Sequence, residues 1–173
     1  WLITQKRFRP KSLLNNDPLR DLLAKRIDLK RLPALMEQGH LRALAITASS
    51  YSTGEHITFY DSQQAITPWV RNQRLAQCGR LSHEHLMASS AIPFIFPAIG
   101  LEGPQGRAYF GDGSMRQTAP ISPAIHLGAD KILVIGVGRM LEPPKKDSGE
   151  SSYPSLADIA GHALSSIFLD SLA

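Results

Sequence analysis

The chain has 173 residues, of which 43% are hydrophobic and 20% are charged, and this composition excludes a largely disordered protein. A chain near this length buries roughly 70% of the surface that its unfolded form exposes, so one domain with a core is expected. The net charge is +4, yet ten basic and four acidic residues lie in 1–42, and the remaining residues carry a net charge of −2. Because the positive charge is confined to one end, nucleic-acid binding is disfavoured.

Cys78 is the only cysteine, which excludes a disulfide within the chain and a metal site built from several cysteines. No run approaches the ~18 apolar residues that span a bilayer. The sequence begins at Trp1 in the middle of a pattern and ends inside a helical periodicity. We therefore expect a part of a longer protein, stable beside the rest of that protein or beside a second copy.

Residues 1–12 form a basic segment around Phe8. Such a cluster can contact anionic lipid headgroups, and a solvated linker is the competing interpretation. Its basic residues are Lys6, Arg7, Arg9 and Lys11.

Two helices are predicted next. Asp17 is placed to cap the first, with Pro18 at its first helical position, and leucines follow at helical spacing as far as Ile27. A second, short helix over 32–38 is expected to end at Gly39.

Strands follow the helices. Residues 42–48 predict a buried strand, and the apolar alternation in 56–61 predicts a second, joined to the first by a turn over 49–55 as a β-hairpin. A helix is expected from Ser82. The glycines between 100 and 106 predict a loop, and the next residues predict a short strand that runs into a turn at 111–113.

The last third predicts alternating elements. Residues 120–127 indicate a short helix capped by Gly128, and the apolar run at 131–137 indicates a strand buried on both faces. A helix followed by such a strand is half of an α/β unit, so the fold class is α/β. Residues 142–154 are polar and rich in Pro, Gly and Ser, which predicts a mobile loop. The stripe in 155–173 predicts an amphipathic helix that packs on a core, because its polar face is not basic.

Three motif interpretations fail on spacing. A dinucleotide fingerprint after residues 131–137 needs a third glycine where the chain has Leu141. His83 and His85, two apart on a helix, point about 200° away from each other and make a poor metal pair. The pentapeptide G-x-S-x-G of a nucleophile elbow does not occur in the 173 residues.

Asp112 remains as the strongest chemical candidate, because it follows a strand and lies between Gly111 and Gly113. Asp-Gly is common in ordinary turns. The functional interpretation is that the strand end presents a carboxylate, and that the glycines allow another backbone or a substrate to come close.

Three segments in order resemble the C-terminal half of a bacterial patatin-like phospholipase domain. They are ITASSYSTGEHITFYD at 46–61, ASSAIPFIFP at 88–97 and FGDGSMRQTAPISPAIHLGADKILVIGV at 110–137. The A-S-x-x-x-P segment and the D-G-[GA] turn are two of the four signature blocks of that family. The resemblance extends over about residues 13–173, so the chain is interpreted as the C-terminal portion of such a domain. It implies an incomplete three-layer α/β/α fold with a mostly parallel central sheet.

By this resemblance, Asp112 is the acid of a Ser–Asp dyad in a lipid acyl hydrolase that uses neither metal nor cofactor. Gly111 and Gly113 shape its turn, and the serine nucleophile and the oxyanion loop belong to blocks outside these residues. Ser114 departs from the usual Gly or Ala, and Thr118 stands near a position that is often Asn.

The resemblance also implies a phospholipid or other acyl-ester substrate, and a bacterial protein in the cytoplasm or at the membrane surface. Ser89 and Ser90 are interpreted as helix-end hydroxyls that bond to the backbone rather than as nucleophiles, and Pro93 as the residue that fixes the exit from that helix. Three alternatives stay open: a noncatalytic lipid-surface module that depends on 6–11, a nucleic-acid binder, which the acidic remainder of the chain disfavours, and a lysophospholipase or thioesterase of the same fold.

Overall fold

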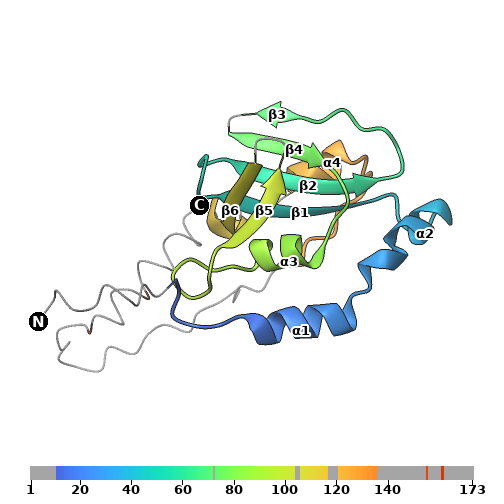
Figure 1. The fold of residues 1–173 in the computed structure, drawn as a ribbon. Coiled ribbons are helices and arrows are strands. Elements are labelled where there is room, and N and C mark those ends of the chain that lie inside the picture. The colour runs from blue at the N-terminus through green and yellow to red at the C-terminus, as the bar shows by residue number, and fades with distance from the viewer. Residues whose placement is uncertain are drawn as a thin grey trace, which may run out of the picture.

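The computed structural model describes residues 11–71, 73–103, 106–116 and 121–135, together with residues 155 and 161. Figure 1 shows a twisted sheet with helices around it. In chain order the elements are α1 (Asp17–Arg26), the 3₁₀ turn η1 (Leu29–Arg31), α2 (Leu32–Glu37), β1 (Ala43–Ser50), β2 (His56–Ser62), β3 (Val70–Arg71), β4 (Arg74–Cys78), α3 (His83–Ser89), β5 (Ile99–Gly103), β6 (Gly106–Asp112), the 3₁₀ turn η2 (Gly113–Arg116) and α4 (Ile121–His126). The class is therefore α/β, as predicted.

The six strands form one mixed sheet in the order β3-β4-β2-β1-β6-β5. Within the described residues only β2 and β4 pair in parallel, and the other four pairings are antiparallel. The expectation of a mostly parallel sheet is thus wrong for this part of the chain. Hairpins dominate here because short connections join β1 to β2 and β5 to β6, and a short connection forces antiparallel pairing.

Helices lie on both faces of the sheet. Side chains alternate between the two faces of a strand, and on β1 the even-numbered Ile46 and Ala48 join the core beneath α3. The odd-numbered Ala45 and Thr47 instead line a cavity whose other wall is α4. α3 therefore packs on one face of the sheet, and α4 lies across the cavity on the other face (Figure 1).

The β1–β2 hairpin is confirmed, with Ala43 opposite Ser62 and Ser49 opposite His56. Its first strand continues to Ser50, two residues further than predicted.

The prediction of a loop over 100–106 is wrong, because these residues belong to a β-hairpin. β5 and β6 pair from Ile99 opposite Phe110 to Gly103 opposite Gly106. The glycines concealed the alternation of Ile99 and Leu101, which point into the core. The pair β3 and β4 had no counterpart in the sequence prediction.

One edge of β1 lacks a strand partner over its first residues. Ser50 donates its backbone N–H to the carbonyl of Glu55, just before β2, whereas Tyr51 donates to the carbonyl of Tyr109 on β6. In an antiparallel ladder such bonds recur every second residue, so the odd-numbered backbone groups of β1 face the β6 side. β6 pairs there only with residues 48–50. Over residues 43–45, the odd-numbered groups have no strand partner among the described residues, whereas Gly113 lies against the Thr47 carbonyl.

The helix boundaries agree with the sequence apart from one cap. Asn16, not Asp17, occupies the N-cap of α1, and its carbonyl accepts from the first turn. Asp17 is the first helical residue, so Pro18 still lies in the first turn, where its missing N–H costs no helical hydrogen bond. α3 begins after Ser82, where a capping box joins Ser82 and His85. Gly128, at φ +86°, follows α4.

The prediction of a strand at 131–137 is also wrong for the residues that the structure describes. Residues 131–135 form no strand, and Leu133 and Ile135 are 86% and 87% exposed. A strand buried on both faces needs neighbours on both edges, and nothing in the described part of the chain pairs with these residues. Residues 136–137, the predicted loop at 142–154 and nearly all of the predicted helix at 155–173 lie outside the described residues.

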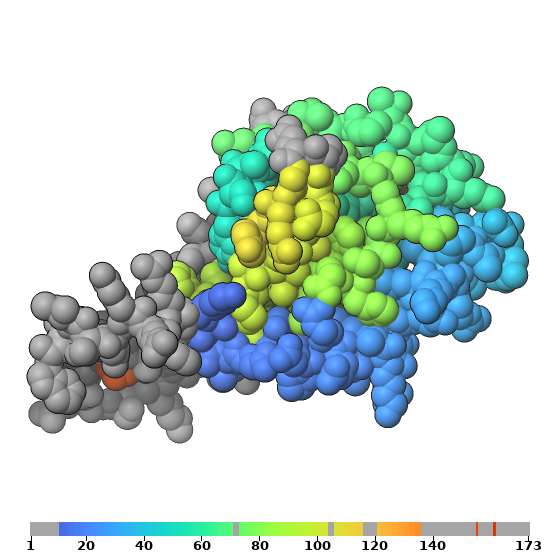
Figure 2. Space-filling model, in the orientation of Figure 1, coloured from blue at the N-terminus to red at the C-terminus, as the bar shows by residue number. Residues whose placement is uncertain are grey.

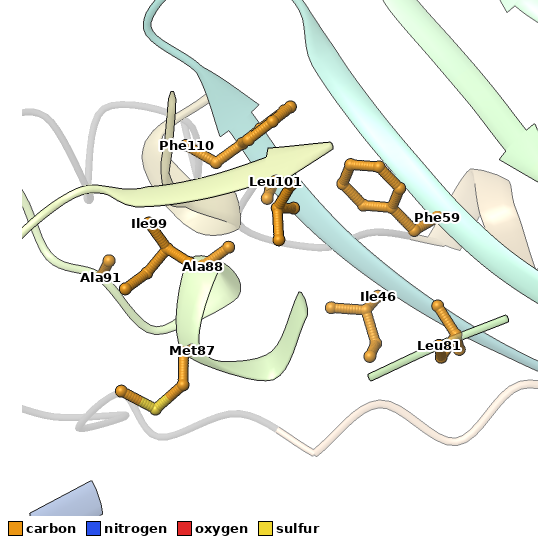
Figure 3. Packing of buried hydrophobic residues seen from close by; sticks show 10 residues of the cluster. Ile46, Phe59, Leu81, Met87, Ala88, Ala91, Ile99, Leu101 and Phe110 are labelled. Carbon is orange, nitrogen blue, oxygen red and sulfur yellow. The ribbon is translucent and has the colours of Figure 1, made fainter. Parts of the chain in front are cut away.

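The core lies between α3 and the sheet. Figure 3 shows Met87 and Ala88 of α3 beneath strand residues such as Ile46 and Ile99. Two aromatic contacts order its upper part, because the Phe59 ring packs edge-on against Phe110 at 5.5 Å and against His85 of α3 at 4.7 Å.

The N-terminal part of the described chain runs beside the segment that follows α3. Leu13 and Leu14 donate backbone hydrogen bonds to Phe94 and Ile95. In Figure 2 this blue segment accordingly lies against the yellow-green one.

Candidate active site

Asp112 lies at the C-terminal end of β6, where three parts of the chain meet. It is opposite Ala48 of β1. Its backbone N–H donates to the carbonyl of Ala91, just after α3, at 3.0 Å. The three segments that carry the family resemblance are therefore brought together at this carboxylate, which is half-buried.

The orientation of the Asp112 carboxylate is fixed by Ser114. The Ser114 backbone N–H donates to Oδ1 at 2.8 Å, and its hydroxyl donates to the same oxygen at 2.7 Å. Within the described part of the chain no hydrogen bond reaches Oδ2. Ser114, at the position where the resemblance expects Gly or Ala, thus adds one donor that a smaller residue could not supply.

The glycines on either side of Asp112 are both closely approached by other residues. A Cβ at Gly113 would overlap the backbone carbonyl of Thr47 on β1, and a Cβ at Gly111 would overlap the phenol of Tyr51. The prediction that a glycine here admits another backbone is confirmed for Gly113. The turn is therefore pressed directly against the central strand.

Tyr51 is a neighbour of the site that the sequence did not indicate. Its phenol covers Gly111, and its hydroxyl lies 4.0 Å from the sulfur of Met115. Burial raises the pKa of this phenol above the usual 10.0, and the negative charge of Asp112 raises it further. No local motif marks Tyr51, because only the β1–β6 register brings residues 51 and 112 together.

The two serines at the C-terminal end of α3, Ser89 and Ser90, have structural roles. Ser90 donates its hydroxyl to the Leu86 carbonyl at 2.6 Å, as predicted for a helix-end serine. Ser89 is the last residue of α3. Pro93 is buried, and Phe94 after it has φ +65° and is 71% exposed.

A second polar pair lies on the β1–β2 hairpin. The Ser49 hydroxyl is 3.2 Å from Nδ1 of His56, and these residues are only 8% and 5% exposed. A serine beside an imidazole resembles a nucleophile and its base. Burial of both groups shields this pair from a substrate, so we assign it to the hairpin's internal hydrogen bonding.

The two histidines of α3 have separate local partners. Nε2 of His83 is 2.8 Å from the Ile27 carbonyl. Nδ1 of His85 accepts from the Ser82 backbone at 3.0 Å, and burial lowers the pKa of this imidazole. Among the residues that the structure describes, no three His, Cys, Asp or Glu side chains are grouped as a metal site requires.

Several predicted features lie outside the described residues: Lys6, Arg7, Arg9 and Thr118. Lys11 is exposed. None of the helices searched in the described part combines the length and apolar character needed to cross a membrane.

The comparisons with known proteins return no relatives. No protein-family model matches the chain, and neither a curated protein nor a solved structure matches it.

Proposed function

We propose that these residues belong to a lipid acyl hydrolase of the patatin type, in which Asp112 is the acid of a Ser–Asp dyad. The carboxylate accepts the proton of a serine hydroxyl as that serine attacks an ester carbonyl, and an acyl-enzyme forms. Water then releases the fatty acid. The substrate class is a phospholipid or a related acyl ester, without metal or cofactor.

The observation that carries the proposal is the geometry of Asp112. A general base must hold one oxygen toward its proton donor. Ser114 engages Oδ1 twice, which orients the carboxylate and leaves Oδ2 for a serine hydroxyl. The meeting of the three resembling segments at this residue gives the same assignment independent support.

The attacking serine is proposed to lie outside the 173 residues. Ser114 is the nearest hydroxyl in the described site, but it is two residues from Asp112 and its own N–H bonds to the same oxygen. Such a closed local turn stabilises backbone structure and presents no hydroxyl to a substrate.

The test is hydrolysis of a p-nitrophenyl ester by the chain alone and by a longer protein that contains it. The chain alone should be inactive. In the longer protein, Asp112→Asn should remove activity by orders of magnitude, because the amide cannot accept the serine proton. Ser114→Ala is the matched control, since it keeps the carboxylate and its backbone donor, and it should retain most of the activity.

Two results would overturn the proposal. Turnover by the chain alone that Asp112→Asn abolishes would place the nucleophile within these residues. Unchanged turnover of the longer protein after Asp112→Asn would remove Asp112 from the mechanism. The noncatalytic alternative predicts liposome co-sedimentation that survives Asp112→Asn and is lost when the charges of 6–11 are removed.

A further inference from the structure

A cavity of about 360 Å³ opens on the α3 face of the sheet, in the part that α3 leaves uncovered. Its wall is formed by residues of β2, β4, β5 and β6, and Figure 3 shows Phe59 of β2 and Leu101 of β5 from that wall. We call this cavity the strand cup. Its apolar wall consists of Ile57, Phe59, Leu75, Leu101, Ala108 and Phe110.

The mouth of the strand cup is polar and carries one unmatched charge. Glu55 lies two residues before Ile57 on the same face, is half-buried, and forms no ion pair with a described residue. The other carboxylate at the cavity, Glu102, lies 3.7 Å from Arg107.

The turn that carries Glu55 is held by its own side chains. Thr53 donates its backbone N–H to the Ser50 hydroxyl at 3.1 Å, and Glu55 donates to the Thr53 hydroxyl at 3.4 Å. The backbone at Glu55 is therefore held in place beside the apolar wall.

We infer that the strand cup binds a single alkyl or acyl chain that ends in a cationic group. The apolar wall takes the chain, and the Glu55 carboxylate attracts the cationic end. The volume lies near the lower limit of about 300–1,000 Å³ for ligand pockets, which suits one chain rather than two. This inference does not depend on hydrolysis at Asp112, whose hydrogen-bond partners are not part of the cavity wall.

The first measurement is calorimetric titration of the chain with hexyl-, octyl- and decyltrimethylammonium below their micelle concentrations. Each methylene that enters the strand cup should raise the affinity about fourfold, until the cavity is full. A stoichiometry of one is expected. Affinity that does not change with chain length would overturn the inference.

The second measurement varies the head at constant chain length. Octyltrimethylammonium should bind more tightly than octanol, and octyl sulfate least tightly. Glu55→Gln should reduce the advantage of the cation about two- to fivefold, the range of a solvent-accessible ion pair. A preference that is unchanged in Glu55→Gln would refute the role of this carboxylate, and this isosteric variant leaves the wall intact.

The third measurement fills the cavity. Ala108→Trp places a large side chain in the strand cup, whereas Tyr109→Trp alters the next residue of β6, which points to the opposite face. Binding should be lost only in Ala108→Trp. Binding that survives Ala108→Trp but is lost in Leu133→Asp would place the ligand on the exposed apolar segment at 132–135 and overturn the assignment.

Discussion

The close approach of Gly113 to β1 makes a sharp prediction about stability. In Gly113→Ala the new Cβ would overlap the Thr47 carbonyl oxygen, and it would lie 2.7 Å from both the carbonyl carbon and Oγ1 of that residue. Thr47 cannot move aside cheaply, because it belongs to the strand that pairs with both β2 and β6. Overpacking typically costs about 1–3 kcal/mol, and backbone neighbours place this variant near the upper end.

Other glycines of the same chain provide graded controls. A Cβ at Gly100 would meet only the guanidinium of Arg107, whose side chain is 61% exposed and can swing away. A Cβ at Gly79 would meet nothing within 4 Å. We expect Gly100→Ala to cost less than about 1 kcal/mol and Gly79→Ala to lie within about 0.5 kcal/mol of the parent.

Urea unfolding followed by tryptophan fluorescence measures this order. A loss of about 3 kcal/mol at Gly113 corresponds to a Tm about 6–12 °C lower for a chain of this size. If Gly113→Ala were as stable as Gly79→Ala, the turn would not be pressed against β1, and the position of Asp112 derived from that contact would be wrong.

Three further predictions concern β1, the site and α3. Because the edge of β1 over residues 43–45 has no strand partner among the described residues, the amides of Ala43 and Ala45 should exchange with deuterium much faster than those of Leu44 and Ile46, which face β2. Equal protection would mean that the edge is filled. The charge of Asp112 helps to hold the Tyr51 pKa above 10.0, so Asp112→Asn should lower the ionisation midpoint of that phenol, read as the tyrosinate absorbance missing in Tyr51→Phe. An unchanged midpoint would contradict their proximity. Burial holds the pKa of His85 below 6.5. The neutral imidazole therefore stabilises the folded chain above that pH. This contribution is lost at lower pH, because the unfolded chain takes up the proton first. His85→Gln keeps an acceptor for the α3 cap and should therefore lose less stability than the parent between pH about 7.5 and about 5.5, as measured by urea midpoints.

Local signals in the sequence predicted local structure well. The β1–β2 hairpin follows from alternation and a turn, and the start of α3 follows from Ser82, because both depend on residues a few positions apart. The turn at Asp112 could be predicted for the same reason. Tyr51 could not, since its place beside Asp112 depends on the pairing of β1 with β6, and the two residues are far apart in the chain.

The error at residues 131–137 has a different physical origin. An apolar, β-branched run indicates that its residues are suited to burial, but it does not say which strand will cover them. In the described part of this run the exposed fraction alternates, with 42% at Ile132, 86% at Leu133, 58% at Val134 and 87% at Ile135. All four side chains are exposed, and no strand among the described residues covers them.

The open edge of β1 and the site at Asp112 are parts of one arrangement. β6 leaves β1 after Asp112, where Gly113 lies against Thr47, and beyond that point the odd-numbered backbone groups of 43–45 have no strand partner among the described residues. The same turn directs the carboxylate and its Ser114 partner to the end of that open edge. A strand added there parallel to β1 would finish beside Asp112, so any group at its C-terminal end would meet the carboxylate. The hydrogen-exchange experiment on residues 43–46 therefore tests more than a strand edge: it shows whether the place from which a reacting group could reach Asp112 is open in the chain as it stands.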